Sequence, residues 1–251
     1  MLTSTYIHMP RIGSTLEKRI WSNGVKTWEE FMDKKDELLI APSKKNMIVT
    51  GIRESFERLE SRDFDFFAKS LPRAEHWRAF EEFSGKVAYV DIETTGLSPR
   101  SSSITVVGIY DGKDARTYVK GIDLDEIVDI FPEYEFLVTF NGARFDLPFI
   151  KHEFPGIEFN QLHADLMYPL RRISLTGGLK KIECELGISR AEETVGISGF
   201  DAVRLWHQYE RGDDDALELL LKYNREDIVN LKTIIDMMLP RFIENKFSEC
   251  I

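Results

Sequence analysis

Cysteines and long apolar runs are scarce in this 251-residue sequence. The only two cysteines are Cys184 and Cys250, too few for a disulfide-stabilised secreted scaffold, and they favour reduced thiols in a cytoplasmic protein. No apolar run approaches the ~20 residues that cross a bilayer, and the N-terminal residues lack the basic-then-apolar pattern of a signal peptide. We therefore expect a cytoplasmic protein without a membrane partner.

Basic residues are outnumbered by acidic ones, 33 to 43, so the formal net charge is -10. Proteins that bind nucleic acid through general electrostatics are usually basic, so the composition argues mildly against that partner. The argument weakens if bound divalent cations neutralise some of the carboxylates. Local basic clusters at 43–46, 171–172 and 180–181 are equally compatible with a solvated surface and with phosphate contacts.

The sequence pattern changes near Gly85. Before this residue, Ser14 with Glu17 and Thr27 with Glu30 have the spacing of a capping box, which is typical of helix starts. We predict a small helical region over residues 1–84, followed by a second domain over residues 85–251.

The second domain alternates strands and helices. Its strand-like segments are KVAYVDIETT, SITVVGIYD, ARTYVK, EFLVTFNG and LHADL, and helical patterns follow the third, fourth and fifth of them. The longest helix is expected to run from about Asp215 to Pro240, since apolar residues recur there at helical spacing. This order predicts an α/β fold with a mixed sheet.

Two carboxylates end the first of these strands, in VAYVDIETTG. Asp91 and Glu93 flank Ile92, so their side chains point to the same face of the strand. Burying two neighbouring carboxylates is costly unless a cation pairs with them, and carboxylate oxygens suit Mg²⁺ or Mn²⁺. The alternative is a solvated strand end that binds nothing.

Two further aspartates occupy apolar surroundings. Asp146, in FNGARFDLPF, lies one turn into a helix, where the helix dipole alone could also favour it. Tyr223 and Asp227, in YNREDIVNL, are four residues apart and share one helix face, as they would in any amphipathic helix. If the four carboxylates converge, we expect metal ions rather than a basic side chain to neutralise them.

The motifs D-I-E-T-T-G, N-G-x-x-F-D and Y-x-x-x-D, in this order, resemble the three exonuclease motifs of the DnaQ-like DEDD superfamily, in its tyrosine-bearing (DEDDy) branch. The resemblance covers about Gly85 to Pro240, and GGLKKIECELGISR is similar to the YprB-type ribonuclease H-like domains of that superfamily. It implies a ribonuclease H-like fold, with a five-stranded mixed sheet flanked by helices. It also implies a 3′–5′ exonuclease that hydrolyses DNA or RNA to nucleoside 5′-monophosphates.

The resemblance assigns a role to each matching residue. Asp91 would bridge two Mg²⁺ or Mn²⁺ ions, Glu93 and Asp227 would hold the ion that activates water, and Asp146 would support the second ion. Tyr223 would orient the attacking water or help to deprotonate it. The partner would be a nucleic acid, single-stranded or with a free 3′ end.

Residues that could contact this substrate are less clearly marked. Thr94, Asn141 and Lys180 are candidates, although Asn141 could instead cap a helix and Lys180 could lie beside a tight turn. Arg171, Arg172 and Arg190 could contact phosphates or lie on a solvated face, and His163 fits a structural role better than a functional one.

The segment IHMPRIGSTLEKRIWSNGVKTWEEF, from about Ile7 to Phe31, resembles a helix-hairpin-helix element with P-R-I-G as its hairpin. Such an element grips the nucleic-acid backbone without reading sequence. Arg11, Gly13 and Lys18 would be the contacts. A purely structural helical cap is the alternative, and Trp21 and Trp28 are expected in its core.

Two other functions are compatible with these patterns. A metal-dependent phosphohydrolase acting on nucleotides or short oligonucleotides would suit the acidic charge. A non-catalytic nucleic-acid-binding module of the same fold is disfavoured by the complete acidic set and the tyrosine. DNA and RNA cannot be distinguished, because no motif reports a contact with the 2′-hydroxyl.

Overall fold

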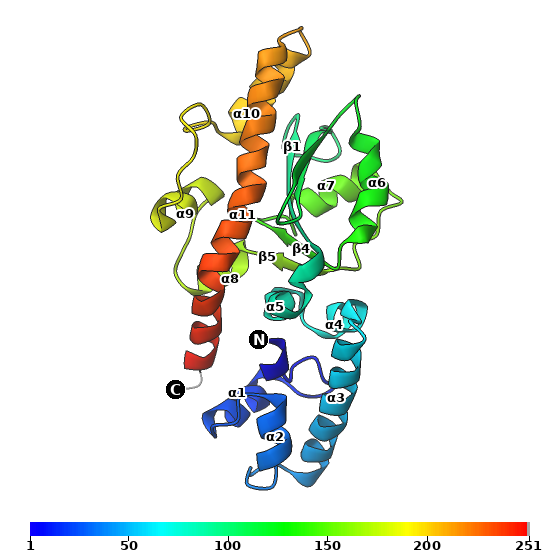
Figure 1. Ribbon diagram of the computed structural model, residues 1–251, viewed down its shortest axis with the longest axis vertical. Coiled ribbons are helices and arrows are strands. Elements are labelled where there is room, and N and C mark those ends of the chain that lie inside the picture. Colours follow the sequence, from blue (N-terminus) through cyan, green and yellow to red (C-terminus); the bar gives the residue numbers. More distant parts are fainter. Residues whose placement is uncertain (250–251) are drawn as a thin grey trace. The chain divides into compact units, whose positions relative to one another are not determined.

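The computed structural model describes residues 1–249 (Figure 1). The chain divides into two compact units. The helical unit comprises Met1–Gly85, Asn160–Ala164 and Leu239–Ile251, and the sheet unit comprises Lys86–Phe159 and Asp165–Met238. Cys184 is an exposed free thiol, whereas Cys250 lies outside the described residues. Among the described helices, none has the length and apolar content needed to span a membrane.

Helices make up most of the helical unit, as the sequence predicts. They are η1 (Leu2–Ser4), α1 (Ser14–Ser22), α2 (Trp28–Lys34), α3 (Pro42–Glu60), α4 (Phe64–Ser70), η2 (Arg73–Ala79) and α5 (Phe80–Phe83). Thr27 and Glu30 form the expected capping box at the start of α2. The capping box predicted for Ser14 and Glu17 at the start of α1 is wrong, because the N-cap residue is Gly13, which carries no side chain.

Glu17 instead lies at the centre of a buried polar cluster. Its carboxylate accepts hydrogen bonds from Thr5 Oγ1 at 2.7 Å, from the Tyr6 amide at 2.8 Å and from Arg78 Nη1 at 2.9 Å. Neither Glu17 nor Arg78 exposes its side chain. The tertiary partner therefore outcompetes the local cap, and Trp21 and Trp28 are buried in this core as predicted.

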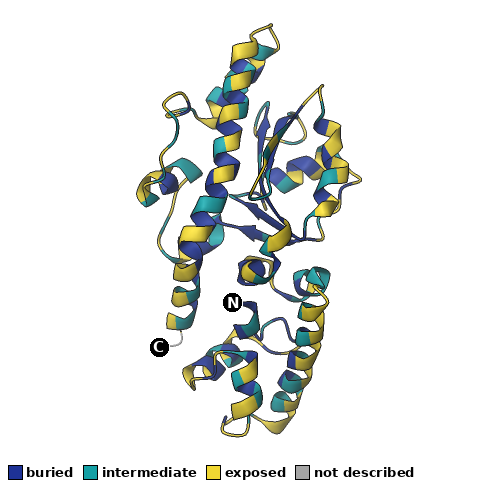
Figure 2. Ribbon diagram, in the orientation of Figure 1, coloured by how far each residue is buried: buried dark blue, intermediate teal, exposed yellow. Residues whose placement is uncertain are grey.

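The predicted five-stranded mixed sheet is confirmed. Its strands are β1 (Val87–Thr94), β2 (Ile104–Tyr110), β3 (Ala115–Val119), β4 (Phe136–Thr139) and β5 (Leu162–Asp165). They lie in the order β3-β2-β1-β4-β5. Strand β1 pairs antiparallel with β2 and parallel with β4, and β2 pairs antiparallel with β3. The paired core strands appear almost entirely buried in Figure 2.

Helices complete the sheet unit. They are η4 (Leu124–Glu126), α6 (Ile127–Ile130), η5 (Phe131–Glu133), α7 (Asp146–Glu153), α8 (Met167–Arg172), α9 (Leu179–Leu186), α10 (Gly199–Tyr209) and α11 (Asp214–Ser248). The part of α11 up to Met238 belongs to the sheet unit. One apolar core joins β1 to α6 and α7, and includes Val90, Ile127 and Phe149. A second joins β2 to α10 and α11, and includes Val106 and Trp206.

The long helix α11 does not end at Pro240, as the sequence suggested, but continues to Ser248. Proline removes one backbone donor from a helix and usually breaks it. Here the residues that follow are packed within the helical unit: Phe242 is buried, and its ring centroid lies 5.7 Å from that of Trp77 in the same unit. This packing offsets the lost hydrogen bond.

Candidate metal centre

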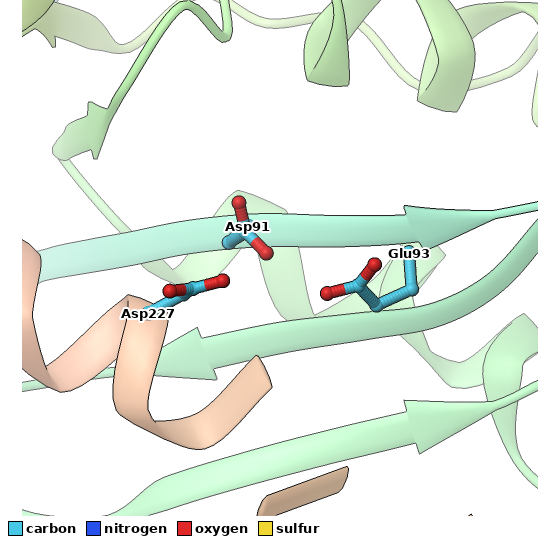
Figure 3. Close-up of side chains that lie close together, drawn as sticks. All are labelled: Asp91, Glu93 and Asp227. Atoms are coloured by element: carbon cyan, nitrogen blue, oxygen red, sulfur yellow. The ribbon is translucent and has the colours of Figure 1, made fainter. Parts of the chain in front are cut away.

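Strand alternation and one helix bring three carboxylates together in the sheet unit. Asp91 and Glu93 leave β1 on the same side, and Asp227 approaches them from α11 (Figure 3). Each residue offers a carboxylate oxygen, and these oxygens all lie within 4.8 Å of one another. Asp91 is partly buried, while Glu93 and Asp227 are buried. The structure therefore creates an acidic cluster with hard oxygen donors.

Asp146 lies beside this cluster rather than within the group of three. It is the first residue of α7 and is 3% exposed. Burial raises its pKa to about 7, and repulsion from Asp165 and Asp227 adds to the effect. Hydrogen bonds from backbone amides, including that of Ile92, oppose this rise. Asp146 is close enough to Asp91 and Glu93 to repel their charges.

The cluster is electrostatically strained when no cation is bound. Burial, followed by repulsion from Asp227, raises the pKa of both Asp91 and Glu93 well above the ordinary carboxyl range. Burial also raises the pKa of Asp227, against the lowering effect of Arg190. A divalent cation would relieve the repulsion, and carboxylate oxygens are the donors that Mg²⁺ and Mn²⁺ prefer. The donor set therefore fits such an ion.

The expectation that no basic side chain would pair with the cluster is wrong. Arg190 donates a hydrogen bond to Asp227 Oδ1 and two more to Glu183, at 2.6 Å and 2.7 Å. Its side chain is 7% exposed, so it does not lie on a solvated face. Arg190 follows α9 in a loop with no helical or strand periodicity, and its sequence position gives no indication of this contact.

Tyr223 and Lys180 lie at the edge of the cluster. Tyr223 precedes Asp227 by one turn of α11 and is 5% exposed. Lys180, on α9, donates a hydrogen bond to the Tyr223 hydroxyl, and its Nζ lies 4.1 Å from the centroid of the tyrosine ring. Burial raises the pKa of Tyr223 and lowers that of Lys180. Lys180 is therefore near the carboxylates, in the first turn of α9 after Gly178.

Sequence reasoning missed Asn224, which holds Asp91. Its Nδ2 donates to Asp91 Oδ2 at 2.9 Å and to the Asp91 carbonyl at 3.3 Å. Gly108 on β2 makes room for it, because a Cβ there would lie 2.1 Å from Asn224 Oδ1. A glycine inside a strand often marks such a close approach, and this was the available sequence signal.

A cavity of about 550 Å³ opens beside the carboxylates. Its lining combines the three clustered acids with Thr94, Tyr223 and apolar side chains from β1, the following loop and α10. Thr94 is buried and donates a hydrogen bond to the Gly96 carbonyl at 2.6 Å. Leu97 and Phe200 are 88% and 73% exposed at the cavity. The cavity is thus lined by both carboxylates and apolar side chains.

Asn141 lies in the turn before α7 rather than in the lining described for this cavity. Its backbone is left-handed, with φ 64°, and its amide donates to Asp165 Oδ1 at 2.7 Å. The expected capping role is wrong, because the N-cap of α7 is Phe145 and no side chain caps that helix in the described chain. Asp165 also accepts from the amides of Ala143 and Met167, so it shapes this turn.

Other candidates, including Arg11 and His163, lie in the helical unit. Arg11 has φ 65°, and its carbonyl accepts a hydrogen bond from Lys44 Nζ at 2.6 Å. Before the P-R-I-G turn, η1 is a 3-10 helix of three residues, so an α-helix follows the turn but does not precede it. The His163 amide donates to His76 Nδ1 at 3.0 Å, which fits the structural role expected for this segment.

The residues that match a known protein family include most of the sheet unit. A family model described as the RNase H superfamily matches residues 88–239. None of the curated proteins matches the chain. A family B DNA polymerase from the hyperthermophilic archaeon Pyrobaculum calidifontis shares 17% identity at a TM-score of 0.50, over 62% of this chain and 24% of the polymerase. The chain thus spans about a quarter of that protein, and this likeness shows a shared fold.

Two other solved structures are covered over most of their own length. NrnC from Brucella melitensis, bound to pGG, shares 21% identity at a TM-score of 0.45, over 68% of this chain and 80% of NrnC. A structure described as the apo form of the nuclease shares 19% identity at a TM-score of 0.42, over 70% of this chain and 83% of that one.

Proposed function

We propose that this chain, which belongs to the RNase H superfamily, is a metal-dependent 3′–5′ exonuclease of the tyrosine-bearing DEDD branch. Its substrate would be DNA or RNA, single-stranded or with a free 3′ end, and its products nucleoside 5′-monophosphates. One observation carries the proposal: one carboxylate oxygen from each of Asp91, Glu93 and Asp227 lies within 4.8 Å of the other two, and these residues line a cavity that Tyr223 also lines.

Asp91, Glu93 and Asp227 would hold one divalent ion, and Asp146 would help to hold a second. Bound Mg²⁺ or Mn²⁺ would polarise a phosphodiester. It would also lower the pKa of a water molecule bound to it, so that this water could act as a nucleophile at neutral pH. Without this counter-charge, the raised pKa values of Asp91 and Glu93 would oppose a fully ionised site.

Tyr223 and Lys180 would act on the reacting groups. The Tyr223 hydroxyl lies within hydrogen-bond reach of the Lys180 ammonium, so it can accept that bond and donate its own proton toward a water in the cavity. Burial raises the pKa of Tyr223, which favours orientation of the water over removal of its proton. Lys180 would add positive charge beside the phosphate, where negative charge grows during the displacement.

The cavity walls suit nucleobases. Leu97 and Phe200 expose apolar side chains that gain little from water contact. An aromatic face can stack on any base, and such stacking does not depend on sequence. We therefore propose that the enzyme removes terminal nucleotides without strong base preference.

The helical region would position the nucleic acid. We propose that residues 1–84 and 85–251 are separate domains, with Arg11 and Gly13 of the P-R-I-G segment contacting backbone phosphates. A cytoplasmic location is part of the same proposal. Because the chain has a net charge of -10, a phosphohydrolase on short oligonucleotides or nucleotides is the second candidate function.

A substrate panel tests these proposals. End-labelled single-stranded DNA, RNA and a dinucleotide would be incubated with Mn²⁺ or Mg²⁺, with and without chelator. We expect a ladder shortened from the 3′ end that the chelator and Asp91→Ala both abolish. Asp236→Asn, which changes an exposed carboxylate on α11, is the matched control and should retain activity.

Each alternative gives a different result in this panel. Cleavage of the dinucleotide alone would favour the second candidate function. Full activity of Asp91→Ala would show that the carboxylate cluster is not the site of hydrolysis. Nucleic-acid binding without hydrolysis under either metal would indicate a non-catalytic module.

A further inference from the structure

A buried chain of polar side chains runs from α9 to Asp227 on α11. Arg190 Nε donates to Glu183 Oε2 at 2.6 Å, and its Nη2 donates to Glu183 Oε1 at 2.7 Å. The same Nη2 donates to Asp227 Oδ1. The side chains of Glu183, Arg190 and Asp227 are 1%, 7% and 7% exposed. One planar guanidinium thus connects a carboxylate outside the metal centre to one inside it.

Glu183 is fixed from a second direction. Asn230 Nδ2, three residues beyond Asp227 on α11, donates to Glu183 Oε1 at 3.0 Å. Glu183 therefore accepts bonds from both Arg190 and α11 and cannot rotate freely. A bidentate Arg–carboxylate pair is directional as well as strong, so the direction of the guanidinium follows from the position of Glu183.

The backbone beside Arg190 is anchored to the same helix. The Ala191 amide donates to Glu226 Oε1 at 2.9 Å, and the Thr194 hydroxyl also donates to Glu226. These contacts hold the loop after α9 against α11 without using the Arg190 side chain. Substitution of Arg190 should therefore leave the loop in place, which makes the side chain testable on its own.

Arg190 is poorly placed for a direct substrate contact. It is absent from the lining of the cavity beside the carboxylates. Its Nη1 is buried and has no hydrogen-bond partner within the described chain, with Glu226 at 3.8 Å. The other guanidinium nitrogens are occupied by Glu183 and Asp227.

We propose that Arg190, oriented by Glu183, is a positioning residue that fixes the Asp227 carboxylate for metal binding. The bond to Oδ1 leaves Oδ2 as the Asp227 oxygen available to an ion. This inference rests on the proposed metal-dependent function. Two effects oppose each other here: the positive charge of Arg190 repels a cation, whereas a fixed carboxylate binds it better. The proposal is that fixation outweighs repulsion.

Calorimetric titration of Mn²⁺ into the full-length protein, without substrate, separates these two effects. Fixation predicts that Arg190→Gln weakens Mn²⁺ binding by about 10- to 100-fold, the usual cost of losing a residue that orients a ligand. Repulsion alone predicts tighter binding, because a positive charge has been removed. In the same variant kcat should fall, whereas KM for a short oligonucleotide should change little, since Arg190 does not line the cavity.

Three companion variants complete the test. Glu183→Gln keeps one acceptor for Arg190, so its Mn²⁺ affinity should fall in the same direction but less. Arg190→Lys keeps the positive charge but loses the planar guanidinium that binds Glu183 through two nitrogens. Its Mn²⁺ affinity should lie between those of the wild type and Arg190→Gln. Arg204→Gln removes an exposed cation that pairs with Asp201 on α10, and its affinity should equal that of the wild type.

Mn²⁺ binding by the wild type tests the proposed function, whereas the ratio of the Mn²⁺ affinities of Arg190→Gln and the wild type tests the positioning role. If the wild type bound no Mn²⁺ and hydrolysed nothing, the proposed function and this inference would both be overturned. If the wild type bound and hydrolysed normally while Arg190→Gln bound Mn²⁺ as tightly or more tightly, only the positioning role would be refuted. Thermal unfolding by circular dichroism identifies a misfolded Arg190→Gln, in which case Glu183→Gln decides.

Discussion

Asp146→Asn should stabilise the metal-free protein, and the effect should grow with pH. Asp146 is 3% exposed, and burial together with repulsion from Asp165 and Asp227 raises its pKa from 3.8 to about 7. A carboxyl group with a raised pKa in the folded state contributes most to stability below pH 3.8. That contribution is lost as the pH rises through about 7, because the unfolded chain ionises more easily.

The size of the effect follows from this pKa difference. At about 1.4 kcal/mol per pH unit, the rise from 3.8 to about 7 makes the ionised Asp146 cost the folded state about 4 kcal/mol at pH 8. Asparagine keeps an oxygen that can accept the backbone amide of Ile92 but never carries the charge. For a chain of this length, about 4 kcal/mol corresponds to roughly 10 °C in the thermal midpoint.

The assay is thermal unfolding in chelator across pH 4 to 8. The variant and the wild type should unfold at similar temperatures at pH 4, and the variant should unfold later at pH 8. Added Mg²⁺ at pH 8 should reduce the difference in unfolding temperature between the variant and the wild type, since the ion stabilises the wild type more. Asp236→Asn, at an exposed carboxylate paired with Lys232, serves as the control. Equal midpoints at pH 8, or a difference independent of pH, would refute the electrostatic argument.

Three other substitutions probe separate parts of the chain. Tyr223→Phe removes a hydroxyl but no metal ligand, so kcat should fall by about 10²-fold while the Mn²⁺ affinity measured by calorimetry is unchanged. Gly108→Ala places a methyl group 2.1 Å from Asn224 Oδ1. The displaced amide should lower hydrolysis at least about tenfold and destabilise the protein by about 1–3 kcal/mol in urea, and normal activity would contradict this packing. Arg78→Met leaves Glu17 buried without its cation and should cost about 3–5 kcal/mol in urea unfolding, part of which a second change, Glu17→Gln, ought to restore.

Local periodicity accounts for what the sequence could predict of the site. Alternation along β1 places Asp91 and Glu93 on one face, and helical spacing stacks Tyr223 on Asp227, whatever the rest of the chain does. Asn224, 133 residues from Asp91 in sequence, donates to that carboxylate. No spacing rule reaches that far. The convergence of β1 and α11 was therefore predictable only from the order of the three motifs and their family resemblance.

Three of the wrong predictions share one physical cause, which is a distant partner that overrides a local preference. Glu17 has capping-box spacing, yet its carboxylate binds Arg78, 61 residues away. Pro240 should end a helix, yet buried residues beyond it keep α11 intact. Arg190 resembles a surface cation because its loop has no periodicity, yet it pairs with two buried carboxylates.

The same reasoning changes how the overall charge bears on function. The formal value of -10 counts every carboxyl group as ionised. In the folded protein, burial raises the pKa of Asp91, Glu93 and Asp146, and Arg190 pairs with Asp227. Two divalent ions would add four positive charges at that point. A polyanion approaching the cavity therefore meets a less acidic site than the composition indicates, so the net charge is weak evidence against a nucleic-acid substrate.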